Sequence, residues 1–129
     1  MQKFENFIKA LKNLKEINNY EEPYGTVEIS GMVALYEICF EQAWKTVKEV
    51  LENSGYSEGR TGSPKLILRT AYAAGMIDDE ALWLSALEAR NCAAHAYNEA
   101  IALEIINSSK EKYIPMFDSL KAEIESYWI

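Results

Sequence analysis

The stretch SPKLILRTAYAAGMIDDEALWLSALEARNCAAHAYNE, residues 63–99, decides the fold class because it holds two helical patterns separated only by a short break at GMIDD. Ser63 followed by Pro64 favours a helix start, since the serine can accept an N-cap hydrogen bond and the proline ring fixes φ where no amide donor is needed. We therefore predict one helix over about residues 64–74. A second helix, capped by Asp78, is predicted to run to about Tyr97.

The remaining sequence continues this helical pattern on both sides. Apolar residues recur at helical spacing over residues 2–19 and again from about Glu28 or Ser30 to about Gly55. The segment SGYSEGRTGSP predicts a flexible loop. A last pattern follows Asn98 and continues to about Tyr127, with a kink or break expected at Pro115. We predict an all-α fold, an antiparallel up-and-down helical bundle of four to five helices forming one domain, residues 1–129.

Charge and hydropathy exclude several classes of protein. The formal net charge is −7, which argues against broad electrostatic binding to nucleic acid because that requires a basic face. The N-terminus lacks the apolar segment of a signal peptide, and no stretch approaches the roughly 20 apolar residues of a membrane helix. A cytoplasmic protein is expected, without membrane association. Its two cysteines, Cys39 and Cys92, are expected to be reduced thiols.

Arg90 stands where the apolar stripe of its helix should continue. At about 100° per residue it falls on one face with Trp83, Leu87 and Ala94. An arginine keeps its charge, and burying it unpaired would cost several kcal/mol. Either an acidic partner lies inside the bundle, for which Glu37 and Glu41 are available, or the position opens onto a cleft or a subunit interface.

The single histidine, His95, lies five residues beyond this arginine and about 140° around the same predicted helix. A long Arg90 side chain, or a second copy of the helix, could bring the two groups to one phosphate. Histidine can move protons and arginine can stabilise charge in RNA cleavage without a metal, while Asn91 could orient either group. No metal-ligand spacing and no glycine-rich phosphate loop is present, so neither metal nor cofactor is expected.

At these residues the sequence resembles a known family. ARNCAAHAYNE, residues 89–99, is similar to the Arg-x4-His-x-Tyr signature of HEPN domains, specifically of the nucleotidyltransferase substrate-binding proteins also called HepT-type toxins. FEQAWKTVKEVLENSG, residues 40–55, resembles the second helix of that family, and residues 63–99 follow its middle helices.

The resemblance implies a homodimeric helical bundle that is paired with a minimal nucleotidyltransferase acting as antitoxin, encoded beside it. It implies that Arg90 and His95 are the catalytic pair of a metal-independent endoribonuclease, with Asn91 as a polar helper. Tyr97 would be the tyrosine that the partner modifies with AMP. RNA or a nucleotide is the implied ligand.

Three functions remain open on the sequence alone. The first is a toxin that cleaves RNA through His95 and Arg90. The second is a non-catalytic subunit that binds a nucleotide or substrate for a two-component nucleotidyltransferase. The third is a purely structural bundle in which Arg90 pairs with Glu37 or Glu41.

Overall fold

The computed structural model describes residues 2–129, and the described chain is helical apart from its connections. The α-helices are α1 (Gln2–Leu14), α2 (Thr26–Asn53), α3 (Glu58–Thr61), α4 (Pro64–Ala73), α5 (Glu80–Cys92), α6 (Glu99–Ser108) and α7 (Ile114–Tyr127). Short 3-10 segments, η1 (Lys15–Asn19) and η2 (Ala93–His95), follow α1 and α5, and a π-helical segment, η3 (Ser109–Tyr113), joins α6 to α7.

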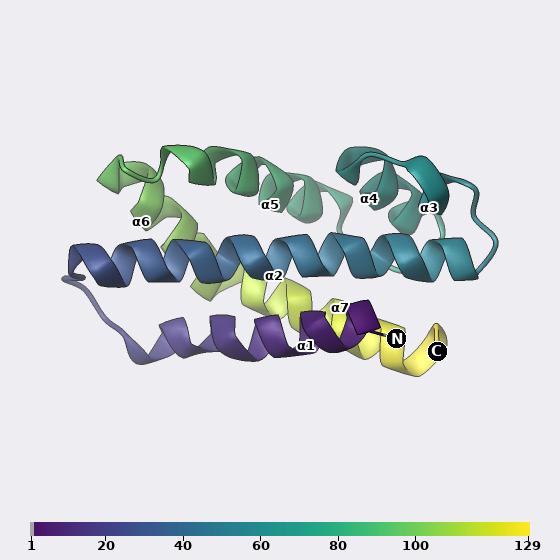
Figure 1. Ribbon diagram of the computed structural model, residues 1–129, viewed down its shortest axis with the longest axis horizontal. Helices are drawn as coiled ribbons and strands as arrows, with labels where there is room; N and C mark the ends of the chain where they lie inside the picture. The colour runs from purple at the N-terminus through teal and green to yellow at the C-terminus, as the bar shows by residue number, and fades with distance from the viewer. Residues whose placement is uncertain (1) are drawn as a thin grey trace.

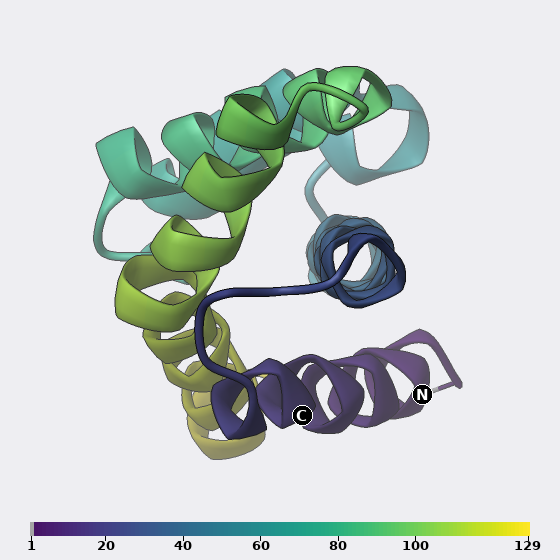
Figure 2. The ribbon, with the colours of Figure 1, turned by 90° about the vertical axis from the view of Figure 1, so that its left-hand side faces the viewer.

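The long helices run antiparallel to their neighbours in the chain, with α2 passing along the middle of the molecule (Figure 1). Seen along α2, helix α1 lies on one side of it, α4 and α5 lie on the other, and the α6–α7 rod closes a third side (Figure 2). The predicted all-α antiparallel bundle is confirmed. None of the helices in the described part of the chain is long and apolar enough to cross a membrane.

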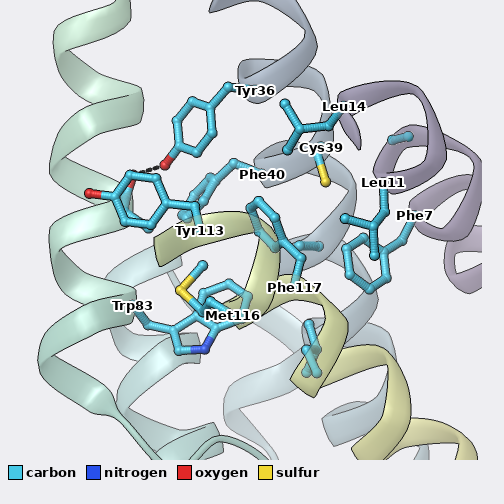
Figure 3. Packing of buried hydrophobic residues seen from close by; sticks show 14 of the residues in the cluster. Phe7, Leu11, Leu14, Tyr36, Cys39, Phe40, Trp83, Tyr113, Met116 and Phe117 are labelled. Carbon is cyan, nitrogen blue, oxygen red and sulfur yellow. Dashed lines mark hydrogen bonds between the residues drawn. The ribbon is translucent and has the colours of Figure 1, made fainter. Parts of the chain in front are cut away.

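Aromatic side chains from four helices meet at the centre of the bundle (Figure 3). The Phe117 ring on α7 lies 6.0 Å from Phe7 on α1, 6.3 Å from Tyr36 on α2 and 5.6 Å from Trp83 on α5, measured between ring centroids. All four side chains are at most 2% exposed. Aromatic pairs at these distances contribute beyond the apolar area that they bury, so this cluster fixes α1, α2, α5 and α7 relative to one another.

Several predicted helix ends are wrong by a few residues. Helix α2 begins at Thr26 instead of Glu28 or Ser30, because the Glu28 carboxylate accepts a hydrogen bond from the Gly25 amide and completes the first turn. Asp79 caps α5, not Asp78, since Asp79 Oδ1 accepts from the Leu82 amide at 3.0 Å. The α-helix then ends at Cys92, not near Tyr97, and Asn98 caps α6.

The structure also explains the segment after α2 and the interruption near Pro115. The predicted loop after α2 contains the one-turn helix α3, which packs closely on α2 because Gly59 has no side chain; a Cβ there would lie 2.5 Å from the Glu52 amide nitrogen. The interruption expected near Pro115 occurs as the π turn η3, immediately before α7. A proline lacks the amide that an α-helix needs at this position, and the wider turn accommodates that loss.

Candidate functional site: a polar cluster at the end of α5

Arg90 is paired with Glu41 across the α5–α2 contact. Arg90 Nε donates to Glu41 Oε1 at 2.6 Å, and Nη2 of the same guanidinium contacts the same oxygen. The other carboxylate oxygen, Oε2, accepts a hydrogen bond from Trp44 Nε1 at 3.1 Å. The side chains of Arg90 and Glu41 are 27% and 31% exposed. The arginine is therefore neutralised by a carboxylate that is itself held in place, while one edge of the guanidinium still faces solvent.

Asn91 holds the opposite edge of the same guanidinium. Arg90 Nη1 donates to Asn91 Oδ1 at 3.0 Å. Of the five N–H groups of an arginine, these contacts use three and leave one on each terminal nitrogen without an acceptor among the described residues. Asn91 is exposed, so its amide nitrogen and the two remaining guanidinium N–H groups can donate to a ligand from outside.

His95 and Tyr97 lie just beyond the end of α5. His95 belongs to the 3-10 segment η2, and its Nδ1 lies 3.5 Å from the Tyr97 hydroxyl. Both residues are exposed, Tyr97 at 86%. The prediction that His95 lies on the same continuous helix as Arg90 is wrong, because the α-helix ends at Cys92. Within residues 2–129 no hydrogen bond or ion pair joins His95 to Arg90.

Of the two acidic partners proposed for Arg90, the structure selects Glu41. Glu37, one turn earlier on α2, is half-buried and makes neither a hydrogen bond nor an ion pair within the described chain. The hydrogen bond between Trp44 and Glu41 was not predicted from the sequence. The spacing of three residues between Glu41 and Trp44 could have indicated it, because side chains so placed are neighbours on a helix.

Tyr36 on α2 is a second residue whose role was not predicted, and it contacts α5 one turn before Arg90. Its hydroxyl donates to the backbone carbonyl of Ala86, one turn before Arg90. Burial raises the pKa of the Tyr36 hydroxyl above its usual value, so the group stays protonated and keeps donating. This bond ties α2 to α5 at the point from which Arg90 projects.

The arrangement is rich in hydrogen-bond donors but carries little net charge. The Arg90 and Glu41 charges cancel, and the surrounding groups are an amide, an imidazole and a phenol. Within residues 2–129 no group of three histidine, cysteine, aspartate or glutamate side chains is placed to hold a metal ion. Such a surface can hydrogen-bond a small phosphate-bearing molecule, whereas a long polyanion is normally bound by many uncompensated cations.

The chain is thus an all-helical bundle with a polar cluster at the end of α5. The chain belongs to the family described as "Nucleotidyltransferase substrate binding protein like", whose model matches residues 2–126. This confirms the nucleotidyltransferase substrate-binding part of the resemblance. A comparison with curated proteins found no match.

Two solved structures are similar to this chain. A protein from Thermus thermophilus is 29% identical, with a TM-score of 0.78 over 92% of this chain and 98% of that one. A Haemophilus influenzae protein is 20% identical, with a TM-score of 0.71 over 97% and 96% of the two chains. The latter structure was described as revealing the fold of a substrate-binding domain of a nucleotidyltransferase, and at this identity the likeness shows a shared fold.

Proposed function

We propose that this protein is the non-catalytic, substrate-binding subunit of a two-component nucleotidyltransferase, and that Arg90, Asn91, His95 and Tyr97 hold a nucleotide. The observation that carries this proposal is the match of the chain to the family over residues 2–126. The guanidinium N–H groups that Arg90 keeps free beside exposed Asn91 distinguish the cluster from a purely structural ion pair. Because Glu41 neutralises Arg90, the cluster offers directed donors without a strong positive field. That chemistry suits a mononucleotide better than RNA.

Tyr97 is proposed as the residue that the partner nucleotidyltransferase modifies. Its side chain is 86% exposed and its hydroxyl is close to His95 Nδ1, a group able to take the phenolic proton. The tyrosine oxygen would attack the α-phosphorus of ATP held by the partner, forming an O–P bond. The bond to the β-phosphate would break and pyrophosphate would leave. The product, an AMP ester, would place a negative charge beside the cluster.

In this proposal the protein is a homodimer, and two copies pack against each other through an exposed stripe on α2. Val27, Gly31, Ala34 and Ile38 follow one another at spacings of four, three and four residues, all exposed, with Val27 at 85% and Ile38 at 52%. This is the spacing of a helix–helix contact, and small residues in its middle permit close approach. Glu41 lies only about 40° around the helix from this stripe. A second copy packed there would bring its own α2 beside the Arg90–Glu41 pair.

Replacing Ile38 with glutamate is expected to convert the dimer to a monomer, because it places a charge in the centre of the proposed contact. Analytical ultracentrifugation across a concentration series would measure this, with at least a tenfold weaker association expected. The matched control is Leu66→Glu on α4, which is 45% exposed and lies away from the stripe. A dimer that survives Ile38→Glu, or a wild-type chain that is monomeric throughout, would exclude this interface.

A second candidate function is the metal-independent endoribonuclease, favoured by an exposed histidine five residues along the chain from an arginine that retains free N–H groups. In that reaction His95 would take the proton of a 2′-hydroxyl and Arg90 would stabilise the charge on the phosphate oxygens. The contact with Glu41 counts against the ribonuclease, because Glu41 already neutralises the Arg90 charge that would have to stabilise the transition state. This protein would then be the toxin and the nucleotidyltransferase its antitoxin.

One set of measurements separates these functions. We expect wild-type protein to bind AMP or ATP in isothermal titration calorimetry, and an Asn91→Ala, His95→Ala variant to bind at least tenfold more weakly because two exposed donors are lost. Asn13→Ala, an exposed change on α1, serves as the control. Mixed RNA incubated in excess EDTA should remain intact with every protein. RNA cleavage by wild type but not by the double variant would instead establish the ribonuclease, and a wild type that neither binds nor cleaves would refute both.

A further inference from the structure

A cleft of about 390 Å³ opens between α5, α6 and the π turn η3. It is lined by Glu88, Ala89 and Cys92 of α5, by Ile101 and Glu104 of α6, and by Tyr113 at the end of η3, among others. The cleft is separate from the polar cluster. Glu88 and Cys92 stand two residues on either side of Arg90, which places each about 160° away from it around the helix. Arg90 faces α2, and the cleft lies on the opposite side of α5.

The floor of this cleft is apolar and its polar atoms are already paired. Tyr113 is 5% exposed, and its hydroxyl lies 3.3 Å from Ser85 Oγ, which in turn donates to the Leu82 carbonyl at 2.7 Å. Ala89, Ile101 and Ile105 supply the rest of the floor. The volume is that of a site that receives one or two side chains. The floor therefore provides apolar contact, and a bound side chain does not have to hydrogen-bond any buried polar group there.

The rim of the cleft is acidic. Glu88 and Glu104 stand on its two opposing helices, both residues are exposed, and no lysine or arginine is among the lining residues. The chain as a whole carries a formal charge of −7. An occupant must therefore combine an apolar group with positive charge on each side of it. RNA and nucleotides are excluded from this face because both carboxylates would repel phosphate.

We propose that the α5–α6 cleft is the docking site for the nucleotidyltransferase, which inserts an apolar side chain flanked by lysine or arginine. The inference rests on the proposed function for the identity of the partner; the cleft fixes the chemistry of the docking segment. Docking here occupies α5 and α6 close to where Tyr97 projects between them, and it leaves both the Arg90–Glu41 pair and the α2 stripe uncovered. The partner can therefore bind without displacing contacts to the Arg90–Glu41 pair or to the dimer stripe.

The test measures the affinity of the purified nucleotidyltransferase from the same genome for the full-length protein. In the Glu88→Lys, Glu104→Lys variant, attraction at the rim becomes repulsion, and we expect binding at least about 30-fold weaker. The control is Glu16→Lys, Glu125→Lys, which makes the same change in net charge at two exposed positions on η1 and α7 and should change the affinity less than twofold. Wild-type binding should also weaken as salt is raised.

A third variant tests the floor without changing charge. Ala100 lines the cleft and is exposed, so Ala100→Trp should fill the opening and weaken binding at least fivefold, while circular dichroism shows an intact fold. Equal losses in both charge variants would mean that only net charge matters and would overturn the cleft as the docking site, as would unchanged binding in all three variants. Loss of the homodimer in the Glu88→Lys, Glu104→Lys variant would assign the cleft to self-association instead. A wild type that does not bind the nucleotidyltransferase would refute the proposed function itself.

Discussion

Replacing Phe117 with alanine is expected to lower the free energy of unfolding by about 4 kcal/mol. The ring lies within 6.3 Å of the rings of Phe7, Tyr36 and Trp83, and its side chain is fully buried. Its removal leaves a cavity bordered by α1, α2 and α5 at once, so no single helix can move to fill it. Because domains of this kind are stable by only about 5–15 kcal/mol, the variant should unfold at a clearly lower urea concentration.

The matched control for this core change is Tyr127→Ala. Tyr127 is an aromatic residue on the same helix, α7, but it is 78% exposed. Its removal should change the free energy of unfolding by no more than about 0.5 kcal/mol. Urea denaturation followed by circular dichroism measures both variants. Comparable losses at the two positions would contradict the central role of the aromatic cluster.

The helices could be predicted from the sequence because each carries a long apolar stripe, while their ends depended on competition between neighbouring residues. Asp78 and Asp79 are equally good caps by residue type, and only the structure shows that Asp79 accepts the hydrogen bond from the Leu82 amide. The one-turn helix α3 has too few residues for a periodic pattern. It exists because Gly59 lets the chain approach the α2 backbone, a contact between segments that local reasoning cannot see.

At the candidate site, too, residue types could be interpreted from the sequence, whereas contacts between helices could not. A charge inside an apolar stripe predicted either an acidic partner for Arg90 inside the bundle or a position that opens onto a cleft or an interface, and in the structure Arg90 contacts Glu41. The choice between Glu37 and Glu41 depended on how far α5 is shifted along α2, which the sequence does not encode locally. The turn that carries His95 was missed because alanines surround it and favour continued helix; Asn98, capping α6, fixes the break instead.

Replacing Glu41 with alanine is expected to lower the free energy of unfolding by about 2 kcal/mol, because it leaves a partly buried guanidinium without its carboxylate and Trp44 Nε1 without its acceptor. Glu37→Ala is the matched control. It removes a half-buried glutamate one turn away on the same helix, with no described hydrogen bond or ion pair, and should cost no more than about 0.5 kcal/mol. Chemical denaturation of the two variants provides the comparison.

A double-mutant cycle with Arg90→Ala isolates the pair from other effects of truncation. Once Arg90 is absent, Glu41→Ala should cost about 1 kcal/mol less than it does in the wild type, since no charge is then left unpaired. The same Glu41→Ala change frees Arg90 for an anion, so AMP or ATP should bind several-fold more tightly even though the protein is less stable. Stability and affinity that move in opposite directions would identify Glu41 as the group that restrains Arg90. Affinity that falls together with stability would mean that Glu41 positions the arginine for its ligand.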